Sequence, residues 1–567
     1  MLRLDINILI GGAAGQGIET MALILEKIFL KKGFEVFTIR DYMSRVRGGH
    51  NFSQVRIGHM HFSSHRDTLD FIIAMNEESI SIHTKRLGED GIIICEEAET
   101  GNADNGTDGR DKRLKRFPLK ATASDSGNPK ATGSVAIGVL LASLGIDLKH
   151  VCEVLTDVFS DGNIASQNIK AIESGFSLVK KAAGSEEEIH AAEPSGNERQ
   201  AKMLINGSRA IAAGALAAGC RFYSAYPMTP STDIMNYLAS KMTDFRILVE
   251  QAEDEIAAIN MAIGASYAGV RSMTGTSGGG FSLMVEGLGL AGMLELPLVI
   301  AEMQRPGPAT GFPTRTEQAD LKFVINASQG EFARMVIALK DPEDAFLQTA
   351  RAFNLADKYN IPVILIGDQY LADSSMSVKP FDIEGLKIER SARAIPGAIE
   401  GKTVLVDSDE HDEYCHIAEE AETRVRMSDR RLKKLDLLRQ ELIEPDFIGN
   451  EDFNILLVGW GSTCGPIREA IGLLNEGSQG QTQQQKHRFA ALSFGDVWPL
   501  PVKLLEVCAR TADIVINVEQ NATGQLASLI AEQTAVRCSL GLLKYDGRPM
   551  SGQWISSRIT ELLGGGK

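Results

Sequence analysis

The sequence predicts an α/β protein with three domains, each built around a parallel β-sheet. Short apolar runs, which are typical of buried strands, alternate with segments whose apolar residues recur at helical spacing. This alternation begins again twice after polar stretches, and that pattern favours successive parallel α/β domains. The chain has 567 residues, which is enough for three or four domains at roughly 150 residues each.

The first predicted domain spans residues 1–182. It opens with a buried strand, a glycine turn, a helix with regular apolar spacing and a second strand, predicted at 7–10, 11–17, 19–31 and 35–39. Two further short strands are predicted at 71–75 and 91–95. Residues 98–130 are polar and rich in Gly, Asp and Asn, so we expect an exposed excursion there.

A linker separates this domain from the rest of the chain. Residues 183–200 are polar, acidic and poor in aromatic residues, a composition that does not form a core. Residues 201–375 form the second predicted α/β domain. Residues 376–450 are more charged and are predicted to be a helical connecting segment. The third α/β domain, 451–567, begins with the apolar strand pattern at 454–459.

The composition argues against several classes of function. The net charge is −16, which argues against nucleic acid as a main partner, because duplex binding needs clustered Lys and Arg. No stretch reaches the ~20 uncharged apolar residues of a membrane helix, and the amino terminus has the pattern of a strand. We therefore expect no membrane span and a cytoplasmic location. The seven cysteines include no Cys-x-x-Cys pair, so an iron–sulfur cluster would have to lie on another chain, and we assign no metal site here.

The first strand leads into the turn Gly12-Ala13-Ala14-Gly15-Gln16-Gly17. Glycines between a strand and a helix let backbone N–H groups approach an anion, although the spacing is not that of dinucleotide-binding folds. A tight packing turn is an equal alternative. Downstream, Arg45 and Arg47 stand beside Gly48 and Gly49, where they would either hold a phosphate or carboxylate or brace a domain interface.

The segment Tyr226-Pro227-Met228-Thr229-Pro230 is a stiff loop, because the two prolines restrict the backbone on both sides of the threonine. A rigid loop can present the Thr229 hydroxyl to a substrate. Further on, three acids compete for one role at the start of an apolar helix: Glu253, Asp254 and Glu255. Helical spacing alone does not separate Glu253 from Glu255, and acids at this position also serve as charges that stabilise a helix terminus.

Two glycine-rich loops follow. Ser277, Gly278 and Gly279 lie in a run between a short strand and a helix, where a ring or phosphate can approach the backbone closely. In the Pro- and Gly-rich loop at 304–318, Arg315 is flanked by hydroxyl side chains, and its guanidinium can pair with a carboxylate through two hydrogen bonds.

Together these motifs resemble the 2-oxoacid:ferredoxin oxidoreductases, and most closely the α subunit of the 2-oxoglutarate enzymes with a γ-type domain fused at its amino terminus. The family has a Gly-x-Gly-Gly-Gln-Gly turn, in which Ala14 replaces a glycine here, followed by Arg-Gly-Gly. It has Tyr-Pro-Ile-Thr-Pro, in which Met228 replaces isoleucine, and it has Pro-Thr-Arg-Thr without change around Arg315. The resemblance makes residues 201–375 a thiamine-diphosphate pyrimidine-binding domain and residues 451–567 a transketolase C-terminal-like domain.

The resemblance also implies roles for single residues. Glu255, favoured over Glu253 by its distance to later glycines of the family pattern, would be the catalytic acid beside the cofactor. Pro227, Met228, Ser277, Gly278 and Gly279 would also bind the cofactor, and Thr229, Arg315 and Tyr226 would bind the substrate. Coenzyme A or a domain interface would involve Gly15, Gln16, Gly17, Arg47, Gly48 and Gly49.

The implied reaction is CoA-dependent oxidative decarboxylation of a 2-oxoacid with reduction of ferredoxin, and the fused layout favours 2-oxoglutarate as substrate and succinyl-CoA as product. The chain lacks a Gly-Asp-Gly…Asn motif and cluster cysteines. Mg²⁺ and a 4Fe–4S cluster are therefore expected on a β subunit that shares the thiamine diphosphate in an α2β2 assembly. The alternatives are pyruvate or a branched-chain or aryl 2-oxoacid as substrate, or a non-catalytic nucleotide-binding scaffold. The preferred 2-oxoacid, the direction of the reaction, the ferredoxin and the place of CoA are left open.

Overall fold

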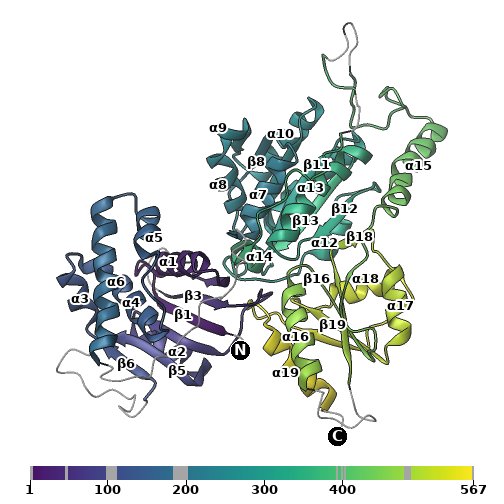
Figure 1. Cartoon of the computed structure of the whole chain (residues 1–567). Coiled ribbons are helices and arrows are strands. Elements are labelled where there is room, and N and C mark those ends of the chain that lie inside the picture. The colour runs from purple at the N-terminus through teal and green to yellow at the C-terminus, as the bar shows by residue number, and fades with distance from the viewer. Residues whose placement is uncertain are drawn as a thin grey trace. The chain divides into compact units, whose positions relative to one another are not determined.

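A computed structural model of the chain describes residues 4–44, 49–97, 112–182, 202–390, 394–397, 400, 404–477 and 487–564. The chain forms two compact units (Figure 1). Unit 1 consists of Met1–Leu204 with Ser374–Pro380, and unit 2 consists of Ile205–Asp373 with Phe381–Lys567. The predicted linker at 183–200 lies outside the described residues, as does most of the predicted excursion at 98–130.

Unit 1 contains an eight-stranded sheet in the order β6-β5-β4-β1-β3-β2-β14-β7. Its strands are β1 (Asp5–Ala13), β2 (Glu35–Asp41), β3 (His50–Gly58), β4 (Leu69–Ala74), β5 (Leu87–Glu96), β6 (Leu114–Phe117), β7 (Met203–Asn206) and β14 (Ser375–Val378). The sheet is mixed, because β3 runs antiparallel to both β1 and β2. The predicted parallel α/β domain is present with one difference, because the antiparallel strand at 50–58 was not predicted.

The helices of unit 1 are α1 (Ile18–Lys31), α2 (Glu77–His83), α3 (Leu119–Asp125), α4 (Thr132–Ser143), α5 (Val151–Val158) and α6 (Gly162–Ala182). Helices α4 and α6 lie side by side (Figure 1), because each has a glycine where they touch. A Cβ at Gly138 would overlap the carbonyl oxygen of Ile172, and one at Gly175 would overlap that of Val135. Their apolar faces complete the main core of this unit.

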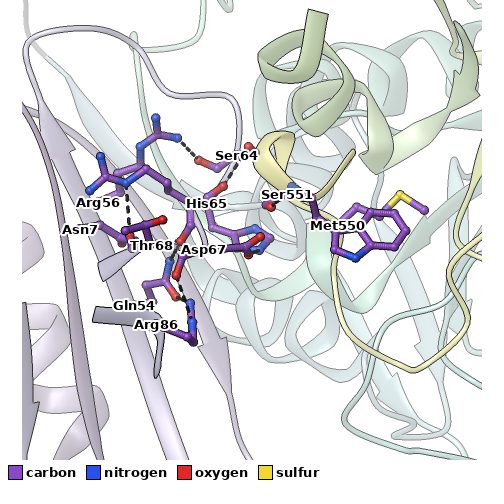
Figure 2. Close-up of polar contacts among 12 residues, drawn as sticks. Asn7, Gln54, Arg56, Ser64, His65, Asp67, Thr68, Arg86, Met550 and Ser551 are labelled. Carbon is purple, nitrogen blue, oxygen red and sulfur yellow. Dashed lines mark hydrogen bonds and ion pairs between the residues drawn. The ribbon is translucent and has the colours of Figure 1, made fainter. Parts of the chain in front are cut away.

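Polar side chains tie the 64–68 loop to the strands of unit 1 (Figure 2). The Asn7 amide donates to the carbonyl oxygen of Thr68 at 2.7 Å, and Arg56 donates to that of Ser64 at 2.7 Å. Arg86 donates to the side-chain oxygen of Gln54 at 2.6 Å. These contacts gather buried polar groups at the edge where β1 begins, away from the glycine turn at its other end.

The first sheet of unit 2 has seven strands in the order β18-β12-β13-β11-β10-β8-β9. They are β8 (Phe222–Ala225), β9 (Leu248–Gln251), β10 (Ser272–Thr276), β11 (Leu298–Gln304), β12 (Met335–Ala338), β13 (Pro362–Asp368) and β18 (Asp496–Trp498). All neighbours are parallel except β18, which runs antiparallel to β12. Parallel order brings the carboxyl ends of β8, β10, β11 and β13 to one edge.

Helices cover both faces of this sheet (Figure 1). They are α7 (Gly207–Ala217), α8 (Thr232–Ser240), α9 (Met242–Phe245), α10 (Glu255–Tyr267), α11 (Gly278–Met293), α12 (Leu321–Asn326), α13 (Pro342–Tyr359) and α14 (Gln369–Asp373). One core is formed with α10, α11 and α12, and the other with α7, α8 and α13. The surface of α10 that faces away from its core is apolar at Ile256 and Met261, whose exposed fractions are 51% and 42%.

The second sheet of unit 2 has five strands in the order β15-β17-β16-β19-β20. They are β15 (Asp446–Gly449), β16 (Ile455–Trp460), β17 (Phe489–Phe494), β19 (Ile514–Glu519) and β20 (Leu540–Leu543), with helices α15 (Ala421–Leu438), α16 (Cys464–Gly477), α17 (Lys503–Thr511), α18 (Gln525–Gln533) and α19 (Gly552–Gly564). None of the helices in the described part of the chain is long and apolar enough to cross a membrane.

Candidate active site

The three competing acids occupy different environments at the start of α10. Asp254 caps the helix, since its side-chain oxygen accepts the N–H of Ala257 at 2.7 Å. Glu253 is exposed. Glu255 is the first helical residue, and its side chain is only 4% exposed. Of the three, Glu255 alone points its carboxyl into the protein.

The Glu255 carboxyl packs against the first turn of α11. A Cβ at Gly280 would overlap Thr276 Oγ1 and would lie 2.5 Å from Glu255 Oε1. This close approach requires glycine at position 280, one residue beyond those selected from the sequence. Glu255 Oε1 is buried and has no hydrogen-bond partner. A buried oxygen without a donor is unfavourable unless another molecule supplies one.

The rest of the glycine turn contacts the loop that follows β11. A Cβ at Gly278 would overlap Asp320 Oδ2, so this glycine is also required by close contact. Gly279 is less confined, because a Cβ there would have Ala309 O as its nearest neighbour at 3.8 Å. Ser277 caps α11 with its backbone only, and its buried hydroxyl has no partner.

The Thr229 loop is fixed by backbone hydrogen bonds. Both the N–H and the hydroxyl of Ser231 donate to the carbonyl oxygen of Met228, at 2.9 and 2.8 Å. The Arg305 guanidinium donates to the carbonyl oxygen of Thr229 at 2.8 Å. Arg305 was not selected from the sequence, although its position directly after a buried strand was a usable signal. Tyr226 precedes the loop and is 41% exposed.

Arg315 lies in the loop between β11 and α12, which contacts the part of unit 2 that holds the second sheet. Its own N–H donates to the carbonyl oxygen of Phe312 at 3.1 Å, and the N–H of Thr316 donates to that of Gly547 at 3.4 Å. Gln318 then donates from its side chain to the carbonyl oxygen of Trp460 at 2.9 Å. The guanidinium is therefore attached to a backbone held from both sides, with Arg315 itself partly buried.

Several buried or partly buried acids lie near the loops of this edge and were not selected from the sequence. Glu302 on β11 is fully buried, and burial with the nearby charge of Asp320 raises the pKa of Glu302 well above its usual range. Burial raises the pKa of Asp320 to about 6 and that of Asp368 to about 6. Burial also raises the pKa of Glu317 to about 7, with the charge of Asp320 adding to it.

The glycine turn of unit 1 has the conformation that its sequence predicts. Gly15 and Gly17 have φ values of 90° and 76°, a region that favours glycine. Gln16 closes the turn, since its Oε1 accepts the N–H of Ala13 at 2.7 Å and its Nε2 donates to the carbonyl oxygen of Met75 at 3.2 Å. Gly49 has φ 79°, while Arg47 and Gly48 lie outside the described residues.

The structure thus brings one group of selected residues together in unit 2. Glu255 and the turn at 277–280 are in direct contact, and Gly279 faces the loop that begins at Arg305. Arg305 in turn donates a hydrogen bond to the backbone of Thr229. Arg315 belongs to the same loop. The selected residues of unit 1 that the structure describes form a separate turn.

Two family profiles match the chain. "Pyruvate flavodoxin/ferredoxin oxidoreductase, thiamine diP-bdg" matches residues 213–430, and "Pyruvate ferredoxin/flavodoxin oxidoreductase" matches residues 7–178. The 2-oxoacid:ferredoxin oxidoreductase subunit alpha of Saccharolobus solfataricus is 31% identical over 98% of this chain and 98% of its own length. The 2-oxoglutarate oxidoreductase subunit KorA of Mycobacterium tuberculosis is 32% identical over 72% of this chain and 65% of its own length.

A solved structure is similar over nearly the whole chain. The 2-oxoglutarate:ferredoxin oxidoreductase from Magnetococcus marinus, with 2-oxoglutarate, coenzyme A and succinyl-CoA bound, has a TM-score of 0.90 at 28% identity and covers 98% of this chain and 99% of its own. The α/β fold class and the thiamine-diphosphate-binding domain predicted from the sequence are confirmed. The chain therefore belongs to the family of 2-oxoacid:ferredoxin oxidoreductase α subunits, thiamine-diphosphate enzymes made of more than one subunit.

Proposed function

We propose that this chain oxidatively decarboxylates 2-oxoglutarate, with CoA, to succinyl-CoA and carbon dioxide, while ferredoxin takes up the electrons one at a time. The observation that carries the placement of the site is the buried Glu255 carboxyl, whose Oε1 lacks a donor and packs against Gly280. Support for the substrate comes from the Magnetococcus marinus enzyme, which binds 2-oxoglutarate and succinyl-CoA, and from the name of the Mycobacterium tuberculosis relative.

The residues around Glu255 fit thiamine diphosphate. The cofactor, when bound, supplies the nucleophilic carbon and the electron sink for decarboxylation. Glu255 Oε1 would meet a ring nitrogen, because it is a buried acceptor that no protein group satisfies. A carboxyl in that position can hold and return a proton during turnover. Pro227, Met228, Ser277, Gly278 and Gly279 would line the cofactor beside it.

The substrate end would use Thr229, Arg315 and Tyr226. Arg305 holds the backbone of Thr229, so the Thr229 hydroxyl has little freedom to move away from a bound 2-oxoacid. Arg315 would hold the substrate carboxylate with two parallel hydrogen bonds. The loop contacts with Gly547 and Trp460 oppose its displacement when the substrate binds.

A β subunit would complete the site and carry Mg²⁺ and the 4Fe–4S cluster, in an α2β2 assembly. Five large apolar or aromatic side chains are exposed on the segments that carry the selected residues of unit 2: Tyr226 at 41%, Ile256 at 51%, Met261 at 42%, Leu283 at 50% and Phe312 at 57%. Such a grouping is typical of surfaces that a partner covers. The cytoplasmic location stays a prediction.

For unit 1 we propose a role in binding CoA or in forming a domain interface, with Gly15, Gln16, Gly17, Arg47, Gly48 and Gly49. Helix α1 begins at Ile18, and its N-cap residue Gly17 provides no side-chain cap, so the backbone N–H groups of the first turn can serve an anion. The Magnetococcus marinus enzyme binds CoA. The negative charge of the CoA phosphates suits such a terminus, and Arg45 and Arg47 of the sequence are residues of the kind that pairs with phosphate.

The test is the activity of the chain purified with its partner subunit. Viologen reduction should require both 2-oxoglutarate and CoA, and should be measured against reactions from which either is omitted. Activity with pyruvate or with a branched-chain or aryl 2-oxoacid instead would keep the reaction and overturn the substrate. An intact iron–sulfur complex that reduces viologen with none of these acids would refute the proposed function.

A further inference from the structure

A pair of carboxyl groups lies beneath the glycine turn of unit 2. Glu302 is fully buried, and neither of its carboxyl oxygens receives a hydrogen bond from a donor group. The Asp320 carboxyl lies close enough to raise the pKa of Glu302 by its charge and by a side-chain interaction. Because two ionised carboxylates repel each other, this contact requires that one of them keeps a proton.

Asp320 connects this pair to the turn. A Cβ at Gly278 would overlap Asp320 Oδ2 and would lie 2.9 Å from its Cγ. The N–H of Asp320 donates to Gln304 Oε1 at 2.9 Å, and Gln304 Nε2 donates to the carbonyl oxygen of Gly367 at 3.0 Å. Gln304 and Glu302 lie two residues apart on β11, so they share a face of the sheet and together hold Asp320 by its backbone and its carboxyl.

The environment indicates which carboxyl keeps the proton. Burial raises the pKa of Glu302 first, and the negative charge of Asp320 adds to it. Burial raises the pKa of Asp320 to about 6, and the hydrogen bond with Glu302 opposes that rise. These directions favour Glu302 as the carboxyl that keeps the proton and Asp320 as the one that accepts the hydrogen bond. Asp368, also near Glu302, has donors of its own in Ser462 and the N–H of Leu371.

The arrangement is suited to a proton and not to a cation. Within the described part of the chain, no group of three or more His, Cys, Asp and Glu side chains is arranged to hold a metal ion. Asp320 is partly buried, while Glu302 has no accessible surface. A single retained proton gives the two facing carboxyl oxygens a shared hydrogen bond.

We propose that Glu302 and Asp320 are positioning residues for the thiamine diphosphate site. A protonated Glu302 holds Asp320 against Gly278 and so fixes the first turn of α11, against which Glu255 packs. This inference deepens the proposed function and rests on it for the identity of the cofactor. The retained proton itself does not depend on turnover, so it can be detected whether or not the enzyme reaction is the one proposed.

Infrared spectroscopy of the complex of this chain with its partner subunit detects the proton directly. Spectra are recorded at slightly alkaline pH, above the pKa values of Glu317 and Asp368. We expect wild type to show a protonated-carboxyl band that shifts in D2O and that is absent in Glu302→Gln. Asp320→Asn should also lose the band, because the introduced amide donates a hydrogen bond to Glu302, which can then be ionised. Glu317→Gln, a nearby carboxyl of raised pKa, should keep it.

Cofactor affinity shows whether the pair positions the turn. The same complex is stripped of thiamine diphosphate and titrated by fluorescence quenching. Glu302→Gln keeps a donor to Asp320, so affinity should stay within about twofold, whereas Glu302→Leu should weaken it about tenfold, the effect of one lost hydrogen bond. The KM for the 2-oxoacid should not change in Glu302→Leu, whereas its unfolding midpoint should fall, because removing one member of a buried polar pair leaves the other without its partner.

Glu343→Gln, an exposed carboxyl on α13 at the other face of the sheet, is the charge control and should bind the cofactor like wild type. The proposal is overturned if the infrared band survives in Glu302→Gln, or if Glu302→Leu binds the cofactor like wild type. It is also overturned if the Gln and Leu variants weaken binding equally. A complex that shows the band, loses it in Glu302→Gln and oxidises no 2-oxoacid would refute the proposed function and leave the proton-sharing pair in place.

Discussion

Replacing Gly280 with alanine tests whether the contact between Glu255 and α11 serves catalysis. The added Cβ would overlap Thr276 Oγ1 and would lie 2.5 Å from Glu255 Oε1 and 2.8 Å from Glu255 Cγ. Since ordinary contacts are near 3.5 Å, the carboxyl has to move by about 1 Å. A displacement of this size in a catalytic group lowers the rate on the order of 100-fold. Overpacking of the buried site also costs about 1–3 kcal/mol of stability.

The assay compares kcat and the unfolding midpoint of Gly280→Ala with those of Gly472→Ala, both in the complex with the partner subunit. Gly472 lies in α16, is exposed and has no atom within 4 Å of an added Cβ. Alanine there should stabilise the helix by about 0.5–1 kcal/mol and leave kcat unchanged. The matched pair separates a general effect of Gly→Ala in a helix from the local clash.

Full activity in Gly280→Ala would refute the reasoning, because Glu255 could then leave its observed position without consequence. A loss of activity with an unchanged KM for the 2-oxoacid and weaker cofactor binding would support it. Equal losses in both alanine variants would show that the effect does not arise from the contact with Glu255.

Four further outcomes follow from the site and from unit 1. Glu255→Gln should lower kcat by about 10²- to 10⁴-fold, the range for a lost acid–base group, while Glu253→Gln in the same assay should not. Thr229→Ala should lose turnover with normal assembly, and Thr229→Ser should restore most of it. Arg315→Lys should raise the KM for the 2-oxoacid about tenfold or more, because Lys cannot replace a bidentate guanidinium. Burial, aided by the charge of Arg86, lowers the pKa of His83 from 6.5 to about 3. As the pH falls, the unfolded chain therefore binds a proton at His83 before the folded protein does, and the free energy of unfolding decreases from about pH 6.5 downward. Urea unfolding should show that His83→Gln reduces this acid dependence, and an unchanged dependence would contradict the assignment.

The parts of the fold that follow from local pattern were predictable. The strand and helix at 7–10 and 19–31 correspond to β1 and α1, with strand ends that extend a few residues further. The strand β3 was not predicted, because its sequence HNFSQVRIG mixes polar and apolar residues without a buried run. Its polar side chains, Gln54 and Arg56 among them, are buried because the 64–68 loop supplies hydrogen-bond partners. That information is tertiary and is absent from the local pattern.

The choice between Glu253 and Glu255 shows a similar limit. Both acids precede the same apolar face, so spacing left them equivalent. The cap at Asp254 resolves them in the structure, since it makes Glu255 the first helical residue and leaves Glu253 outside. An Asp side chain that accepts a hydrogen bond from the backbone N–H three residues later is a recognised helix N-cap. The cap therefore offered a sequence signal for the helix start, from which the burial of Glu255 follows.

Glu302 and Asp368 show a signal that was present in the sequence but was not used in the prediction of the site. Each lies at or near the end of an otherwise apolar strand, and Thr276 ends the strand between the Thr229 loop and β11. The register pairs Thr276 with Glu302 and Gln304 with Asp368. In a parallel sheet, polar residues at successive strand ends meet at the carboxyl edge, which is where ligands bind in open α/β folds. A polar residue that interrupts a buried strand near its end is therefore better evidence for a site than the glycine turn alone, because the turn has a packing explanation and a buried acid does not.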